Sequence, residues 1–103
     1  MTAETPDGRS GGVINSAYGK FSGAGEAAII TLGFVPNYVK VINETDAIVW
    51  EVINGMTATK VAKTAAAVTI ETNSDIVINT DGTVTLSSTL CGNSKVIAWY
   101  ASV

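Results

Sequence analysis

The regular alternation of short strand-forming runs with turn-forming residues limits the fold of this chain more than any other feature. From Val13 onward, about eight or nine runs of four to seven residues follow one another, with turn signals every 8–12 residues. Asn54-Gly55 and Asp81-Gly82 are dipeptides that typically close tight hairpins. Helix-forming patterns are nearly absent. The spacing predicts an all-β domain, a small antiparallel β-sandwich or barrel, and we favour a jelly-roll-like arrangement.

The alternation of side chains along each run indicates which residues face the core. Val39 and Val41 share one face of their strand, and Ile48, Trp50 and Val52 share one face of the next. The expected strands are residues 17–21, 26–32, 38–43, 47–53, 56–64, 68–71, 75–79, 83–87 and 95–103. The third to fifth of these are expected to form an antiparallel meander, and residues 64–67 a bend or bulge.

The first twelve residues differ from the rest of the chain because they contain no apolar run. Pro6, Gly8 and Gly11 lie in this stretch, and little of it is suited to burial. We expect a flexible N-terminal arm over residues 1–12 and a single β domain over residues 13–103. The arm either has no role or becomes ordered on a neighbouring subunit. The stretch also lacks the apolar centre of a signal peptide, which predicts synthesis and folding in the cytoplasm.

Groups that exchange protons or attack carbon are scarce in this sequence. The chain has no histidine and one cysteine, Cys91, and only 15% of its residues are charged. A cysteine nucleophile is usually activated by a neighbouring base such as histidine, so we expect Cys91 to be a small, partly buried apolar residue. The composition therefore predicts a protein that is not an enzyme and needs no cofactor.

The charged residues also give no pattern typical of metal, nucleic-acid or membrane sites. Glu44 and Asp46 lie together in a polar turn, and Asp75 and Asp81 belong to no calcium-binding loop motif, so no metal site is predicted. The net charge is −3 and the basic residues are scattered singly, which predicts no nucleic-acid partner. No apolar run reaches the roughly 18 residues of a membrane-spanning helix, so no membrane partner is expected.

The apolar share of the chain is high for a domain of this size. Hydrophobic residues make up 47% of the sequence, and a small domain has too much surface to bury them all, unless exposed alanine and valine account for the excess. In the closing run, Ala98 and Tyr100 point to one face and Ile97 and Trp99 to the other, so both faces are apolar. Such a strand is covered on both sides or meets a partner, and we favour a partner. The candidate partner-binding residues belong to the arm and to this strand: Thr2, Thr5, Pro6, Arg9, Trp99 and Tyr100.

The segment GFVPNYVKVINETDAIVWEVINGM, residues 33–56, combines a strand, a polar turn and a tryptophan-bearing strand. It resembles a stretch of small proteins encoded beside the major capsid protein in tailed bacteriophages, the head decoration or cement proteins. The residues that carry the resemblance are Gly33, Phe34, Pro36, Tyr38, Val39, Val41, Asn43, Thr45, Asp46, Trp50, Gly55 and Met56.

This resemblance implies a virion protein on the outer surface of the capsid, made in the host cytoplasm, that binds the major capsid protein and stabilises the shell. It also implies a homo-oligomer, a trimer or a dimer. Two other functions stay open. One is a structural protein of the phage tail or neck. The other is a carbohydrate- or host-surface-binding module, because the rings of Trp50, Trp99, Tyr38 and Tyr100 are of the kind that stack on sugars. Trp99 and Tyr100 are adjacent, however, and point to opposite faces of their strand.

Overall fold

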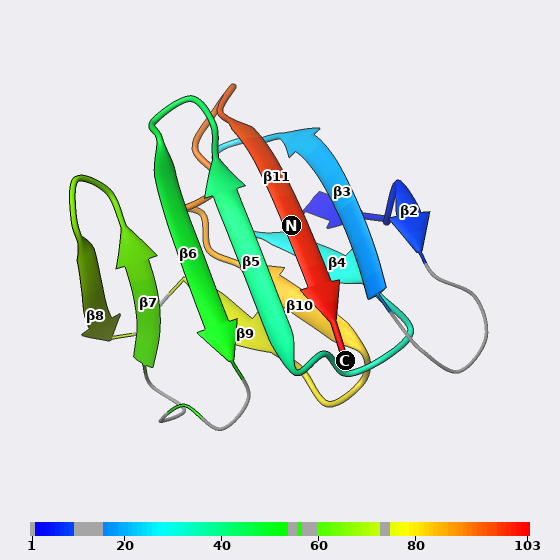
Figure 1. Ribbon diagram of the computed structural model, residues 1–103. Coiled ribbons are helices and arrows are strands. Elements are labelled where there is room, and N and C mark those ends of the chain that lie inside the picture. Colours follow the sequence, from blue (N-terminus) through cyan, green and yellow to red (C-terminus); the bar gives the residue numbers. More distant parts are fainter. Residues whose placement is uncertain (1, 10–15, 54–55, 57–59, 73–74) are drawn as a thin grey trace.

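A computed structural model describes residues 2–9, 16–53, 56, 60–72 and 75–103 of the chain. Two sheets pack face to face, and none of these residues is helical (Figure 1). The smaller sheet has the order β1-β4-β10-β9, formed by β1 (Thr2–Glu4), β4 (Ala28–Thr31), β10 (Thr83–Leu86) and β9 (Ile76–Ile78). The larger sheet has the order β2-β3-β11-β5-β6-β7-β8, formed by β2 (Gly8–Arg9), β3 (Ser16–Ser22), β11 (Val96–Ser102), β5 (Tyr38–Asn43), β6 (Ile48–Ile53), β7 (Lys60–Thr64) and β8 (Val68–Thr72). The predicted all-β antiparallel sandwich is confirmed.

The pairing of the strands is antiparallel except between β1 and β4, which run parallel. The predicted meander is confirmed, and it continues through the bend at residues 65–67 into β8. Asn54-Gly55, predicted to close the hairpin from β6 to β7, lies outside the described residues. Gly82 closes the hairpin from β9 to β10 with a φ of 85°, a conformation that only glycine adopts without steric cost. The sequence favoured a jelly-roll-like arrangement without predicting an order of strands, and the structure gives the order in each sheet.

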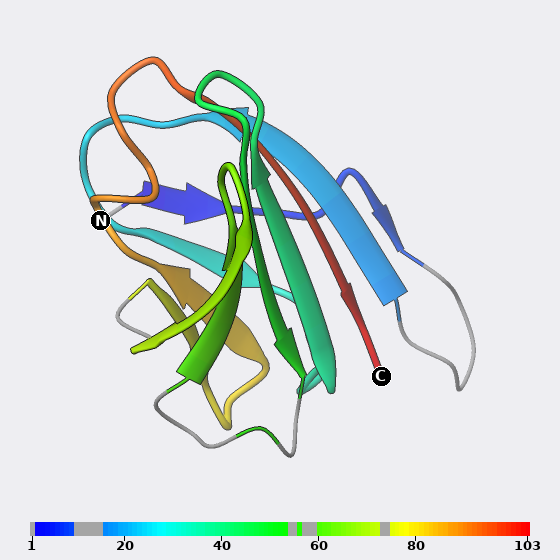
Figure 2. The same cartoon turned by 60° about the vertical axis from the view of Figure 1, so that its left-hand side comes forward.

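The core lies between the two sheets, as the side-chain alternation predicts. Ile30, Val84 and Leu86 point inward from the smaller sheet, and Trp50, expected in the core, is only 3% exposed in the larger one. Figure 2 shows β4 and β10 in one layer and β3, β11 and β5 in the other. The buried apolar residues are Ala17, Ala28, Ile30, Leu32, Val39, Val41, Trp50, Val52, Val61, Ile76, Val84, Leu86, Leu90, Cys91, Ile97, Trp99 and Ala101.

The beginning of the chain is paired with both sheets, which corrects the expected flexible arm over its described residues. β1 lies beside β4, with Thr2 opposite Ala28, and β2 lies beside β3, with Gly8 opposite Tyr18. The backbone N–H of Asp7 also donates to the carbonyl of Tyr18 at 2.7 Å. A strand at the end of a sheet needs backbone donors and acceptors rather than apolar side chains, so a polar segment can supply it. Residues 10–12 of the expected arm lie outside the described residues.

Candidate interaction surface

The outer face of the larger sheet, the side turned away from the smaller sheet, is largely apolar. One row of directly paired positions runs across six strands through Tyr18, Tyr100, Lys40, Glu51, Ala62 and Ile70. The next row runs through Lys20, Ala98, Ile42, Val49, Thr64 and Val68. We call the apolar members of this side the outer apolar face: Tyr18, Tyr38, Ile42, Val49, Ile53, Ala62, Val68, Ile70, Val96, Ala98 and Tyr100.

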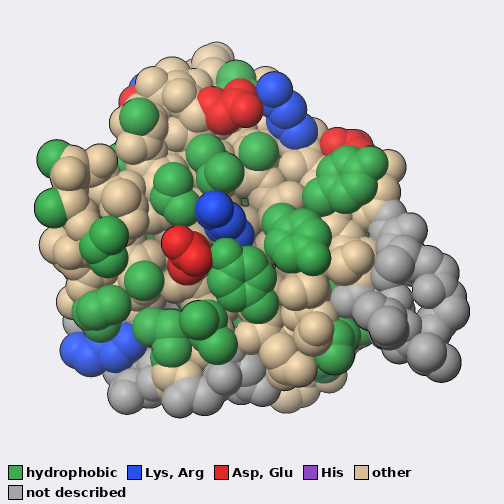
Figure 3. Space-filling view, viewed as in Figure 1, with side chains coloured by type: hydrophobic (Ala, Val, Ile, Leu, Met, Phe, Trp, Pro, Cys, Tyr) green, Lys and Arg blue, Asp and Glu red, His purple; other side chains and the backbone are tan. Residues whose placement is uncertain are grey.

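The outer apolar face is exposed and nearly continuous. Tyr18, Ile53, Val68 and Ile70 are each more than half exposed, and Tyr100 is 41% exposed. Figure 3 looks onto this side and shows hydrophobic side chains gathered around one basic and one acidic group. An apolar patch of several strands is larger than the scattered apolar residues that a monomer normally exposes. This side of the sheet therefore has the character of a binding surface.

Three polar side chains, Tyr38, Lys40 and Glu51, lie at the centre of this surface. Lys40 and Glu51 occupy directly opposite positions on β5 and β6. The Tyr38 hydroxyl donates a hydrogen bond to Oε2 of Glu51 at 2.9 Å. Partial burial raises the pKa of Tyr38 to about 12, and the nearby Glu51 carboxylate acts in the same direction. Because the Tyr38 hydroxyl and the Glu51 carboxylate are already hydrogen-bonded, these two groups lose less when water is excluded from the surface.

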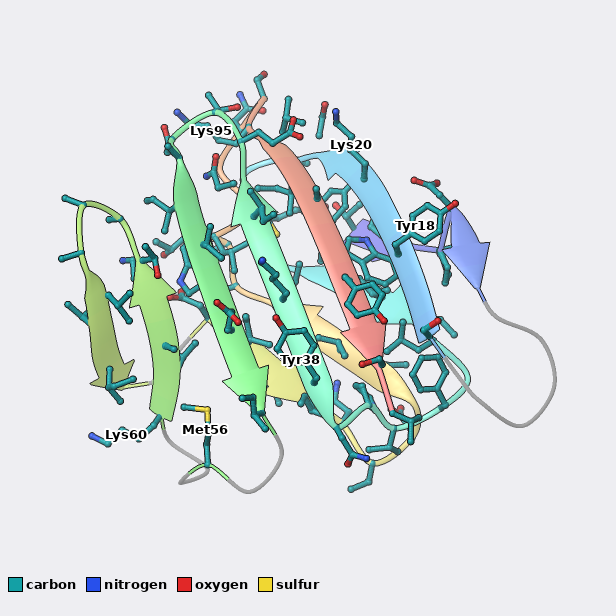
Figure 4. All side chains as sticks on the ribbon, in the orientation of Figure 1. Tyr18, Lys20, Tyr38, Met56, Lys60 and Lys95 are labelled. Carbon is teal, nitrogen blue, oxygen red and sulfur yellow. The ribbon has the colours of Figure 1, made fainter. Side chains whose placement is uncertain are left out.

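Three tyrosines form a line across the surface. Tyr18 lies directly opposite Tyr100 on the neighbouring strand, and the Tyr100 and Tyr38 ring centroids are 6.3 Å apart with an angle of 56° between the ring planes. Figure 4 shows Tyr18 and Tyr38 on the outer side of β3 and β5. Tyrosine is enriched at the energetic centres of protein interfaces because its ring buries a large area while its hydroxyl stays hydrated.

The outer face of the smaller sheet is different in kind. Thr31 and Thr83 pair across β4 and β10, and Thr85 lies next to them on the same side. The Asn79 amide donates to the hydroxyls of both Thr83 and Thr85 at 3.0 Å. Val77, which is 52% exposed, and the half-buried Ile29 are the larger apolar residues of this side among those described. The two outer faces of one small domain thus differ in a way that the need for a folded core does not explain.

Of the two aromatic residues predicted at the end of the chain, only one reaches the surface. Tyr100 belongs to the outer apolar face, as the partner hypothesis requires. Trp99 is 4% exposed and packs in the core, so its predicted place at a contact surface is corrected. β11 is a central strand with β3 on one side and β5 on the other, and the indole fits between the sheets because Gly19 opposite it has no side chain.

The N-terminal candidates lie apart from the tyrosines, with the exception of Arg9. Thr2 is in β1 of the smaller sheet, and its hydroxyl donates to Glu26 at 2.7 Å, which lowers the pKa of that carboxyl. Thr5 and Pro6 lie between β1 and β2. Arg9 pairs with Ala17 at the end of the larger sheet, and its side chain is outside the described part of the chain. The structure therefore brings β2 to the rim of the outer apolar face and leaves Thr2 on the opposite sheet.

Sequence reasoning missed most of the outer apolar face. Ile42, Val49 and Ile53 look like ordinary outward positions when each strand is read alone. Val68 and Ile70 share a side of their strand by alternation, but nothing local says that this side continues the one that carries Tyr100. The signal that was available is that outward positions of six different strands are apolar. Summing outward positions over all strands, instead of judging one closing strand, would have found it.

The polar clusters considered from the sequence take part in local structure. The Asn43 side chain both accepts from the backbone N–H of Asp46 at 2.9 Å and donates to its carboxylate at 3.1 Å, which confirms the expected polar turn. Cys91 is fully buried, where the sequence led us to expect partial burial, and burial raises the pKa of its thiol to about 11. Among the described residues, no three histidine, cysteine, aspartate or glutamate side chains are grouped closely enough to hold a metal ion. The same residues include no helix of the length and apolarity needed to cross a membrane.

Comparisons with known proteins give the chain no relative. No protein-family model, no curated protein sequence and no solved structure matches it. The outer apolar face and the residues themselves are therefore the features that bear on the function of this chain.

Proposed function

We propose that the protein is a structural virion protein that docks on the outside of a bacteriophage capsid and stabilises the shell. The observation that carries the proposal is the outer apolar face, a broad exposed surface with three tyrosines and a hydrogen bond between Tyr38 and Glu51 near its centre. A docking protein needs a rigid body and a surface that loses water on binding, and it needs no reactive group. The resemblance of residues 33–56 to decoration proteins supports the major capsid protein as the proposed partner of this surface.

Stabilisation would follow from binding to one state of the shell. A ligand that binds the assembled shell and not the separated subunits shifts the equilibrium toward the shell in proportion to its concentration and affinity. Many copies on one shell give many such contributions, so each single contact can be weak. Burial of apolar side chains contributes about 25 cal/mol for each Å² removed from water. Because tyrosine rings bury large areas, we expect Tyr18, Tyr38 and Tyr100 to lie at the centre of the contact.

The test is to add purified protein to undecorated phage heads and to measure the temperature at which the heads rupture. We expect wild-type protein to raise that temperature. Tyr100→Lys should remove most of the increase, because it places a charge at the centre of a contact that excludes water. The matched control is Thr85→Lys, which introduces the same charge on the outer face of the smaller sheet and should leave the increase intact. Equal behaviour of the two variants, or no increase with wild type, would count against the proposal.

A tail or neck protein is the nearest alternative, and the same surface would serve it. The two placements differ in assembly: a tail component is expected to form closed rings of several copies without heads, whereas the proposed decoration protein binds to finished heads. Electron microscopy of the purified protein and of the protein mixed with heads separates them.

A carbohydrate-binding module is the second candidate because the three tyrosines are exposed together. The 56° angle between the Tyr38 and Tyr100 rings disfavours it, since a flat sugar ring stacks best on coplanar aromatic faces. Both tryptophans are buried, so saccharide titrations should follow tyrosine emission or chemical shifts. Saturable changes that disappear in Tyr18→Ala would favour this module over capsid docking.

A further inference from the structure

The larger sheet ends at β8, and within the described residues no strand pairs with the outer edge of β8. β8 has five residues, whereas the other strands at sheet ends, β1, β2 and β9, have two or three. An open edge presents unpaired backbone N–H and C=O groups and is a template for another strand. β8 is therefore the longest such template on the molecule among the strands described.

The described side chains of β8 are exposed on both sides of the strand. Residues 65–71 are all exposed, including Thr69 and Glu71, which share the inner side of the sheet with the buried Val61. The sequence VTIET contains neither lysine nor proline, which commonly protect an edge from pairing, and Glu71 is its one charged residue. Figure 1 shows β8 at the end of the larger sheet, beside β7 alone. Pairing on the open edge would give partners to backbone groups that are otherwise exposed to water.

We propose that β8 pairs antiparallel with β8 of a second copy of this chain, which joins two larger sheets into one continuous sheet. A twofold axis at Ile70 pairs all five residues of the strand with those of the second copy. Ile70 then lies opposite Ile70, and Glu71 lies opposite Thr69 of the second copy. Antiparallel strands tolerate such a register because no like charges are directly opposite. An interface of this kind uses the same patch twice and closes after two copies.

The side chains of β8 are complementary under this symmetry. Within one copy the Thr69 hydroxyl already donates to Oε2 of Glu71 at 2.6 Å. The twofold axis places each Glu71 opposite Thr69 of the second copy, so a carboxylate faces a neutral polar side chain and no two carboxylates are directly opposite. Val68 and Ile70, at 68% and 61% exposed, belong to the outer apolar face. Pairing therefore makes the outer apolar faces of two copies continuous, an arrangement that another protein's strand would not produce.

This inference depends on the edge of β8 and not on the identity of the partner that covers the outer apolar face. The first test is cross-linking. Cβ atoms of directly opposite residues in antiparallel strands lie about 4.5–5.5 Å apart, within reach of a disulfide. Ile70→Cys should form a covalent dimer under mild oxidation. Val77→Cys, at the centre of the edge strand β9 and 52% exposed, is the matched control and should remain monomeric. The native Cys91 is buried and does not compete.

The second test uses sedimentation equilibrium over a range of concentrations. Wild-type protein and Val77→Lys should dimerise, and Ile70→Lys, which places two lysines opposite each other, should weaken dimerisation by at least about tenfold. Circular dichroism checks that both variants keep the wild-type fold, as expected for exposed positions. The proposal is overturned if wild type is monomeric throughout, if Ile70→Lys dimerises as well as Val77→Lys, or if Ile70→Cys and Val77→Cys cross-link equally. Head binding by monomeric protein would separate this failure from a failure of the proposed function.

Discussion

Gly19→Ala is the substitution for which the structure gives the clearest physical expectation. Gly19 lies directly opposite Trp99 on the neighbouring strand, and the buried indole covers it. A methyl carbon built at Gly19 would be 2.7 Å from three atoms of the ring, whereas ordinary contacts begin at 3.4 Å. The ring would have to move by the difference, about 0.7 Å, and the closely packed core leaves it little room.

Two opposing effects set the magnitude. Overpacking a well-filled core usually costs about 1–3 kcal/mol. Alanine in place of glycine in a strand returns about 0.5–1 kcal/mol, because glycine loses more conformational freedom on folding. We therefore expect a net loss of about 1 kcal/mol in the free energy of unfolding. For a domain of this size, such a loss lowers Tm by about 4–8 °C.

The assay is urea and thermal unfolding of Gly19→Ala in the wild-type and Trp99→Leu backgrounds. Removing the indole removes the obstacle, so Gly19→Ala should become neutral or stabilising in the second background. Lys20→Ala, at the neighbouring outward position, controls for general effects on β3 and should change stability by no more than about 0.5 kcal/mol. Equal destabilisation by Gly19→Ala in both backgrounds would refute the reasoning, because the cost would then have nothing to do with the ring.

Three further predictions concern single side chains. The pKa of Tyr38, about 12, exceeds its usual value of 10.0, so this residue stabilises the fold fully below pH 10 and loses that contribution as pH rises through 12. Glu51→Gln should lower the pKa, as followed by phenolate absorbance, and an unchanged titration would contradict this. The Cys91 thiol, buried with a pKa of about 11, should react with a thiol reagent only after unfolding, and rapid native-state labelling would argue against its burial. Asn43→Ala should cost about 1–2 kcal/mol in urea unfolding, since it removes both side-chain hydrogen bonds to Asp46, and a loss below about 0.3 kcal/mol would show that they contribute little.

The strands could be predicted from the sequence because side-chain alternation is a local property. β5 begins and ends at the predicted residues, and β10 and β11 differ from prediction by one residue at their ends. The order of the strands could not be predicted, since the placement of β11 between β3 and β5 depends on contacts between distant residues. For the same reason Trp99 was assigned to the surface: its strand is apolar on both sides, and its inward side follows from pairing with the distant strands β3 and β5, where Gly19 leaves room for the indole.

The beginning of the chain shows a second limit of local patterns. A polar, glycine-containing segment is typical of a disordered arm, yet Thr2–Glu4 and Gly8–Arg9 are paired strands. Short strands at sheet ends are held mainly by backbone hydrogen bonds, and these produce no hydrophobic periodicity in the sequence. The glycine at position 8 is a sign of the pairing, because the Tyr18 ring occupies the space where a larger side chain would be. This sign can be interpreted only once β2 and β3 are known to be neighbours.

The two sheets differ in their number of strands, four in the smaller sheet and seven in the larger one. This difference leaves the end of the larger sheet at β8 without a second layer from the described part of the chain. With strands about 4.8 Å apart, three extra strands extend the larger sheet by about 14 Å beyond what the smaller one can cover. At β8 the usual polarity is reversed: Thr69 and Glu71 lie on the inner side, where the second layer is missing, while Val68 and Ile70 lie on the outer side. A sheet that was apolar only to build its core would be polar on both sides at this point. The apolar residues follow the outer side to the last strand, as the proposed docking surface requires.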